Sequence, residues 1–129
     1  MLEDYIKELE QDLRIDDLNL KDYQMRLPSI KHKWAGRLIR LKSTIHSLKK
    51  QKEATKTSIM TEIDATSPVK LTGPVISANA ERHSRVQELT NKISESELLV
   101  ELLEKAEKTL NSCTFDVKNI IEIMKMETM

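Results

Sequence analysis

The strongest apolar repeat of the chain lies in residues 99–124, which read LVELLEKAEKTLNSCTFDVKNIIEIM. Its apolar residues recur at alternating intervals of four and three, which places them on one stripe of a helix. The stripe consists of Leu99, Leu103, Ala106, Leu110, Cys113, Val117, Ile120 and Met124. Leu102, Ile121 and Ile123 widen it. This width predicts a long C-terminal helix that packs against more than one neighbour.

The composition indicates that part of the core lies between subunits. The chain has 129 residues, of which 3% are aromatic and 33% are charged, so little bulky apolar material remains for a large hydrophobic core within a single chain. We therefore expect an oligomeric, coiled-coil-like bundle, although a wide stripe does not fix the number of subunits. The residues expected to hold the subunits together are Leu99, Leu103, Leu110, Val117, Ile120 and Met124.

Three signals locate possible ends or breaks in the C-terminal helical region. Ser77 is placed to cap its start. Ser94 and Glu97 have capping-box spacing, where the helix is expected to restart or bend. Residues 112–115 interrupt good helix formers and predict a local break.

A second stripe runs along the centre of the chain and predicts a long helix that reaches about Met60. It consists of Leu20, Tyr23, Leu27, Ile30, Trp34, Leu38, Leu41, Ile45 and Leu48. Asp16 or Asp17 can cap this helix, whereas Pro28 predicts a kink or a later start near Leu27. A short N-terminal helix is predicted before it by Leu2, Ile6, Leu9 and Leu13.

Small and polar residues with Pro68, Gly73 and Pro74 follow the central helix and predict a loop. With two glycines, three prolines and almost no alternating β-branched runs, the chain is expected to be all-α. We divide its single domain into an N-terminal helical region with a basic helix (1–62), a loop (63–76) and a C-terminal oligomerisation region (77–129).

The net charge of zero conceals opposing blocks. Residues 26–56 contain ten lysines and arginines against Glu53 alone, a net of +9. Residues 1–25 have three basic and eight acidic residues, a net of −5, and residues 93–129 have four and eight, a net of −4. Two interpretations remain open: the cations bind the phosphates of a polyanion, or they pair with the acidic segments of the same or a neighbouring subunit.

Other side chains favour structural roles over chemistry. Trp34 lies on the central stripe, so core packing is favoured over stacking on a nucleic-acid base. His32, His46 and His83 have no metal-ligand spacing with Cys113, and no nucleophile and base group is evident. We therefore expect no enzyme, metal or cofactor. The lone cysteine and the absence of a long apolar run favour a cytoplasmic protein that does not span a membrane.

Short elements in a collinear order resemble the UvsY family of recombination mediators from tailed phages. No single element is specific, so the order along most of the chain carries the resemblance. The elements are Leu2-Glu3-Asp4, Glu8-Leu9, Ile15-Asp16, Lys33-Trp34, Gln51-Lys52, Ser77-Ala78, and finally Phe115, Val117, Lys118 and Ile121.

The resemblance implies a homo-oligomeric ring of six or seven chains, assembled through the C-terminal helices, in the cytoplasm of an infected host. It also implies partners: single-stranded DNA, the phage single-strand-binding protein, and a RecA-like phage recombinase that the mediator helps to load onto DNA. The sequence does not indicate which surface meets either protein. No covalent step or cofactor would be involved.

The chain departs from the family at the segment tied there to DNA binding. It reads Ala54-Thr55-Lys56-Thr57-Ser58, which offers one cation instead of a cluster. The predicted DNA contacts are therefore Arg37, Arg40, Lys49, Lys50, Lys52 and Lys56, with the last four as the main group. The alternative is a structural coiled-coil adaptor or chaperone-like assembly that binds no nucleic acid.

Overall fold

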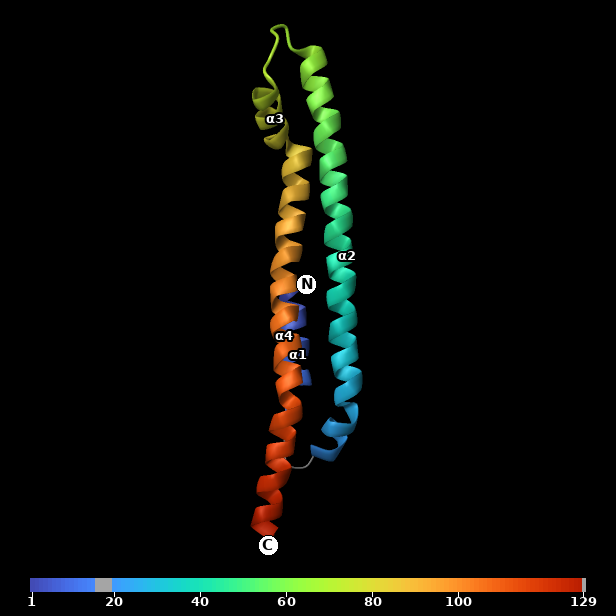
Figure 1. Cartoon of the computed structure of the whole chain (residues 1–129), viewed down its shortest axis with the longest axis vertical. Coiled ribbons are helices and arrows are strands. Elements are labelled where there is room, and N and C mark those ends of the chain that lie inside the picture. Colours follow the sequence, from blue (N-terminus) through green and yellow to red (C-terminus); the bar gives the residue numbers. More distant parts are fainter. Residues whose placement is uncertain (16–19, 129) are drawn as a thin grey trace. The chain divides into compact units, whose positions relative to one another are not determined.

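The computed structural model describes residues 1–15 and 20–128, and these residues form helices and connections without strands. The helices are α1 (Leu2–Asp12), α2 (Leu20–Thr66), α3 (Gly73–Glu81) and α4 (Ser84–Thr128), coloured from blue to red in Figure 1. The all-α prediction and the short first helix are confirmed. The proposed caps Asp16 and Asp17 lie outside the described residues.

The chain forms two compact units, and both long helices contribute to each. Unit 1 contains residues 1–40 and 99–129, and unit 2 contains residues 41–98. In unit 2, Lys49 pairs with Glu97 and Arg85 pairs with Glu62, so α2 and α4 run antiparallel there. In unit 1, Lys31 contacts Thr114, in keeping with the same direction.

Pro28 does not set the start of α2, so the predicted start near Leu27 is wrong. Leu20 and Tyr23 before the proline and Ile30 after it are all buried, and this packing compensates for the backbone hydrogen bond that proline cannot make. Figure 1 shows the first turns of α2 at an angle to the turns that follow, which agrees with the predicted kink.

The predicted loop at 63–76 is too long at both ends. Helix α2 continues to Thr66, because Met60 and Ile63 pack on a small core of Ile59, Ala80 and Val86. Helix α3 begins at Gly73, with Thr72 at its cap position, so the predicted cap at Ser77 is also wrong. Pro74 lies in the first turn of α3, where its missing N–H needs no partner.

Helix α4 is continuous through both predicted interruptions. At residues 112–115 the hydroxyl of Ser112 donates to the carbonyl of Lys108, while Cys113 and Val117 are buried on the inner face. The chain instead breaks between α3 and α4, at Arg82 and His83. His83 accepts a hydrogen bond at Nδ1 from the backbone N–H of Arg85, at 3.2 Å, and so caps the start of α4.

The apolar stripes form the core of each unit. In unit 1, Tyr23 and Trp34 of α2 and Leu103, Leu110 and Val117 of α4 are almost completely buried. In unit 2, the buried residues come from three helices: Ile45, Ile59, Ile76, Ala80, Val86, Leu89 and Ile93. Much of the C-terminal stripe expected between subunits is thus already buried inside one chain.

Candidate nucleic-acid interface

The cations in the first half of α2 pair with the acidic face of α1. Lys33 Nζ donates to Asp12 Oδ2 at 2.6 Å and to Glu8 Oε1 at 3.0 Å. Arg37 Nη1 donates to Glu8 Oε2 at 2.7 Å. This is the internal pairing with residues 1–25 that the charge pattern left open, and it ties α1 to unit 1.

The ion pairs change the pKa values of three side chains, Glu8, Lys33 and Arg37. The hydrogen bond from Arg37 outweighs partial burial and, with the hydrogen bond from Lys33, lowers the pKa of Glu8. Burial opposes the charge of Lys33, but its hydrogen bonds to Asp12 and Glu8 prevail and raise its pKa. The hydrogen bond to Glu8 likewise raises the pKa of Arg37. Glu8, Lys33 and Arg37 are therefore held in their charged forms.

Trp34 belongs to the core of unit 1, as the sequence predicts. Its residue surface is 1% exposed, and its ring meets that of Tyr5 edge to face, with centroids 5.7 Å apart. The Arg37 guanidinium lies 4.9 Å from the Trp34 ring centroid and 5.1 Å from that of Tyr5. This geometry leaves no face of Trp34 open for a nucleic-acid base.

Two of the predicted DNA contacts, Arg37 and Arg40, lie in unit 1 but differ in their surroundings. Arg37 is enclosed by Glu8, Tyr5 and Trp34. Arg40 is exposed and lies along its own helix, with Nη2 at 3.2 Å from the position that a Cβ on Gly36 would take.

The remaining four predicted contacts lie together on α2 within unit 2. Lys49 and Lys50 are exposed, and Lys49 Nζ is 3.5 Å from Glu97 Oε1, a loose pair with a side-chain exposure of 59% for the lysine. Lys52 and Lys56 are each 24% exposed. We call these four residues the α2 lysine cluster.

Lys52 and Lys56 share one carboxylate at the end of α3. Lys52 Nζ lies 3.1 Å from Glu81 Oε1, and Lys56 Nζ lies 3.0 Å from Glu81 Oε2. The bonds from Lys56 and then Lys52 lower the pKa of Glu81. Lys52 continues the stripe of Ile45 and Leu48 by helical spacing, which explains why its stem is half-buried. The sequence pattern did not identify Glu81.

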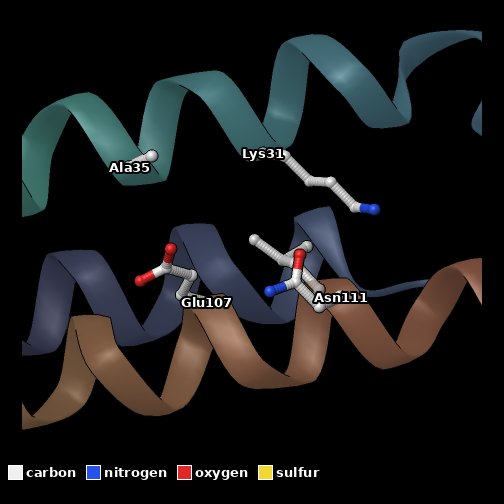
Figure 2. Close-up of a pocket in the computed structure, with 5 residues that line it drawn as sticks. Lys31, Ala35, Glu107 and Asn111 are labelled. Atoms are coloured by element: carbon white, nitrogen blue, oxygen red, sulfur yellow. The ribbon is translucent and has the colours of Figure 1, made fainter.

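A small cavity in unit 1 lies between the facing sides of α2 and α4. Figure 2 shows Lys31 and Ala35 opposite Glu107 and Asn111, and the fifth lining residue is Leu110. The cavity measures about 80 Å³, which suits a few water molecules and is too small for a nucleotide. Lys31 Nζ donates to Thr114 Oγ1 at 2.6 Å, so it is engaged within the fold.

The expected assembly residues divide into two groups. Leu99, Leu103, Leu110 and Val117 are buried inside the chain, whereas Ile120 is half-buried and Met124 is 39% exposed. Near them on α4, Phe115, Ile123 and Met126 are the strongly exposed apolar residues, at 70%, 55% and 75%. The apolar surface at this end of α4 therefore lies on Met124 of the stripe, on Ile123, which was predicted to widen it, and on Phe115 and Met126, which the stripe did not include.

The described residues hold no group of three or more histidine, cysteine or acidic side chains arranged to bind a metal ion. His32 and His46 are exposed, and Cys113 is buried in the core of unit 1, as its place on the C-terminal stripe indicates. None of the helices within residues 1–15 and 20–128 combines the length and apolar character needed to cross a membrane.

The fold places the chain in the class of small all-α proteins built on two long helices with short accessory helices. It is similar to crystal structures of the bacteriophage T4 recombination mediator protein UvsY. In one lattice the TM-score is 0.85 at 17% identity, over 98% of both chains. In a second lattice the TM-score is 0.84 at 17% identity, over 100% of this chain and 98% of the other.

A third lattice of the same T4 protein gives a TM-score of 0.77 at 19% identity, over 100% of this chain and 99% of that one. No protein-family model matches the chain, and no curated protein matches it. The likeness confirms the resemblance drawn from the sequence as a likeness of fold.

Proposed function

We propose that this protein binds single-stranded DNA and acts as a recombination mediator. The observation that carries the proposal is the α2 lysine cluster on a chain with the fold of T4 UvsY. Lys49, Lys52 and Lys56 recur at intervals of three and four along one side of α2, which suits successive phosphates, and Lys50 adds a cation on the side next to Lys49. With Trp34 buried, binding would depend on the DNA backbone, so it would be sensitive to salt and tolerant of sequence.

The four lysines of the α2 lysine cluster differ in exposure, so we expect them to bind DNA in different ways. Lys49 and Lys50 are exposed and can meet a phosphate without any rearrangement of the fold. Lys52 and Lys56 are half-buried beside Glu81 and would engage a strand that is already held by the first two. Arg40 lies in the other unit and remains a further candidate, whereas Arg37 serves the contact between α1 and α2.

The proposal includes self-assembly into a hexamer or heptamer. The support is the exposed apolar surface near the end of α4, formed by Phe115, Ile123, Met124 and Met126. Water-exposed apolar groups concentrated on one helix end mark an interaction surface. An assembly repeats the α2 lysine cluster in every subunit, so weak contacts with one strand add up through effective concentration.

The partners of such a mediator would be the phage single-strand-binding protein and a RecA-like recombinase. The protein would weaken the hold of the first on DNA and help to load the second, by binding alone and without a covalent step. The α2 lysine cluster supplies the contact with DNA in this scheme.

A second function is favoured by the ion pairs themselves. Lys33, Arg37, Lys52 and Lys56 all contact carboxylates of the same chain, as expected of a structural adaptor whose basic helix is neutralised internally. The adaptor would form the same helical assembly but would bind no nucleic acid. Lys50, which is exposed and lies beside Lys49, favours the DNA-binding function.

Titration of a fluorescent single-stranded oligonucleotide at low and moderate salt separates the two functions. We expect binding at low salt that weakens as salt rises, and a loss of about tenfold in affinity for Lys49→Gln/Lys50→Gln, the effect of removing a charge-assisted hydrogen bond. The slope of log affinity against log salt should fall by about 0.7 for each phosphate that the variant no longer neutralises.

The matched control is Lys105→Gln/Lys108→Gln, which removes two exposed lysines from α4. It has the same effect on net charge and should leave most of the affinity intact. Absence of binding at both salt concentrations, or equal losses in the two double variants, would overturn the DNA-binding proposal.

A further inference from the structure

Glu81 binds Lys52 and Lys56, the two half-buried lysines of the α2 lysine cluster, in the way that a phosphate group would. One carboxylate oxygen faces Lys52 Nζ at 3.1 Å and the other faces Lys56 Nζ at 3.0 Å. A backbone phosphate likewise presents two anionic oxygens on one central atom. The ammonium groups of Lys52 and Lys56 are therefore already arranged around an anion before any ligand arrives.

The position of Glu81 is unfavourable apart from these two contacts. It is the last residue of α3, where the helix dipole presents its negative end and disfavours a carboxylate. Its charge is thus stabilised by the lysines and opposed by its own helix. The side chain is 40% exposed, so water and a competing anion can reach it.

The backbone of Glu81 is fixed independently of its side chain. Ile76 and Ala80 anchor α3, with Ala80 packed beside Ile59 and Val86. Gln87 Nε2 donates to the carbonyl oxygen of Glu81 at 2.7 Å. The carboxylate can consequently swing away from the lysines while α3 stays in place.

We propose that Glu81 is a built-in competitor of DNA, which occupies the phosphate position on Lys52 and Lys56 and sets the affinity of the site. The inference rests on the proposed function, since it assigns a regulating residue to the same cluster. A single free phosphate gains little binding free energy by replacing the Glu81 carboxylate, which is tethered to the same chain. A strand already bound at Lys49 and Lys50 presents its next phosphates at high local concentration and displaces it.

Glu81→Gln should tighten single-stranded DNA binding about three- to tenfold, the equivalent of two partly exposed ion pairs. The salt dependence should also steepen, because the freed lysines now release counterions instead of a carboxylate, by about 0.7 in slope for each phosphate they engage. Glu81→Asp keeps the charge and should restore most of the wild-type behaviour.

Two controls separate competition from a structural effect. Glu95→Gln removes one exposed negative charge from the same unit and should change the affinity much less. In a Lys52→Gln/Lys56→Gln background, Glu81→Gln should have no more effect than Glu95→Gln, because the groups for which Glu81 competes are gone.

The outcomes distinguish the inference from the function on which it rests. If the wild-type chain binds DNA and Glu81→Gln matches Glu95→Gln, or if the effect of Glu81→Gln persists without the two lysines, the inference is overturned and the proposed function stands. If neither the wild-type chain nor Glu81→Gln binds DNA at low salt, the proposed function itself fails.

Discussion

The indole Nε1 of Trp34 donates a hydrogen bond of 2.8 Å to Oδ2 of Asp12, the last residue of α1. The same oxygen accepts a hydrogen bond from Lys33 Nζ. Helix α1 has no fully buried residue of its own, so polar contacts of this kind add to half-buried contacts, such as that of Tyr5 with Trp34, in attaching it. Asp12 therefore satisfies the only polar atom of a buried tryptophan side chain and also anchors a helix.

Asp12→Ala should lower the free energy of unfolding by about 1–3 kcal/mol, because it leaves the buried indole N–H without its acceptor. Chemical denaturation followed by tryptophan fluorescence measures the change, and the single tryptophan reports this contact directly. Asp12→Asn keeps an acceptor oxygen and should lose less. Equal losses in the two variants would show that the charge, and not the acceptor, matters.

Tyr23→Phe should leave stability unchanged or raise it by about 1 kcal/mol. Tyr23 is 1% exposed, and its hydroxyl has no hydrogen-bond partner among the described residues. Burial is the main cause that raises the pKa of this phenol, and the Cys113 thiol beside it, a weak hydrogen-bonding group, is the second. Thermal melts of the two proteins test the idea, and a loss above about 2 kcal/mol would reveal a hidden partner for the hydroxyl.

Acid should weaken the contact between α1 and α2. Because the pKa of Glu8 is lower in the folded chain than its ordinary 4.5, the unfolded chain binds more protons between the two values. The stabilisation is complete above about pH 4.5 and is lost as the pH falls through the lowered pKa. Melting temperatures from pH 7 to 3 should therefore fall less steeply for Glu8→Gln than for the wild-type chain.

Ile123→Asp should reduce the mass of the native particle while leaving the chain folded, because Ile123 is 55% exposed on a single chain and its proposed role is between chains. Analytical ultracentrifugation and circular dichroism together measure both effects. Leu110→Ala is the contrasting variant: Leu110 is 1% exposed, so it should lose about 2–5 kcal/mol of stability. An unchanged particle mass for Ile123→Asp would exclude this surface from the assembly.

The apolar periodicity correctly predicted which face of each long helix is buried, because burial follows the helical repeat. Trp34 and Leu110 are both buried as their spacing indicates. The same spacing does not say what covers a face, so residues such as Leu103, assigned to a subunit interface, turned out to be buried within the chain. Local signals at residues 112–115 also failed, because the buried neighbours Cys113 and Val117 outweigh weak helix propensity.

The candidate site was predictable as a set of cations but not as a set of contacts. Lys33 and Glu8 are 25 positions apart, and no local sequence pattern predicts an ion pair between residues so far apart. Glu81 was missed for the same reason, and because α3 starts earlier than the predicted cap at Ser77. The central stripe repeats at intervals of three and four residues, and this repeat continues from Ile45 and Leu48 to Lys52. The repeat was the sequence signal that could have marked Lys52 as an inward-facing residue.

The half-buried setting of Lys52 and Lys56 has an entropic consequence. A lysine side chain loses up to about 2 kcal/mol of rotamer freedom when it is immobilised, and at exposed sites this loss opposes ligand binding. At 24% exposure and bonded to Glu81, both side chains have already lost much of that freedom during folding. An anion that takes the place of Glu81 meets ammonium groups whose ordering is already complete.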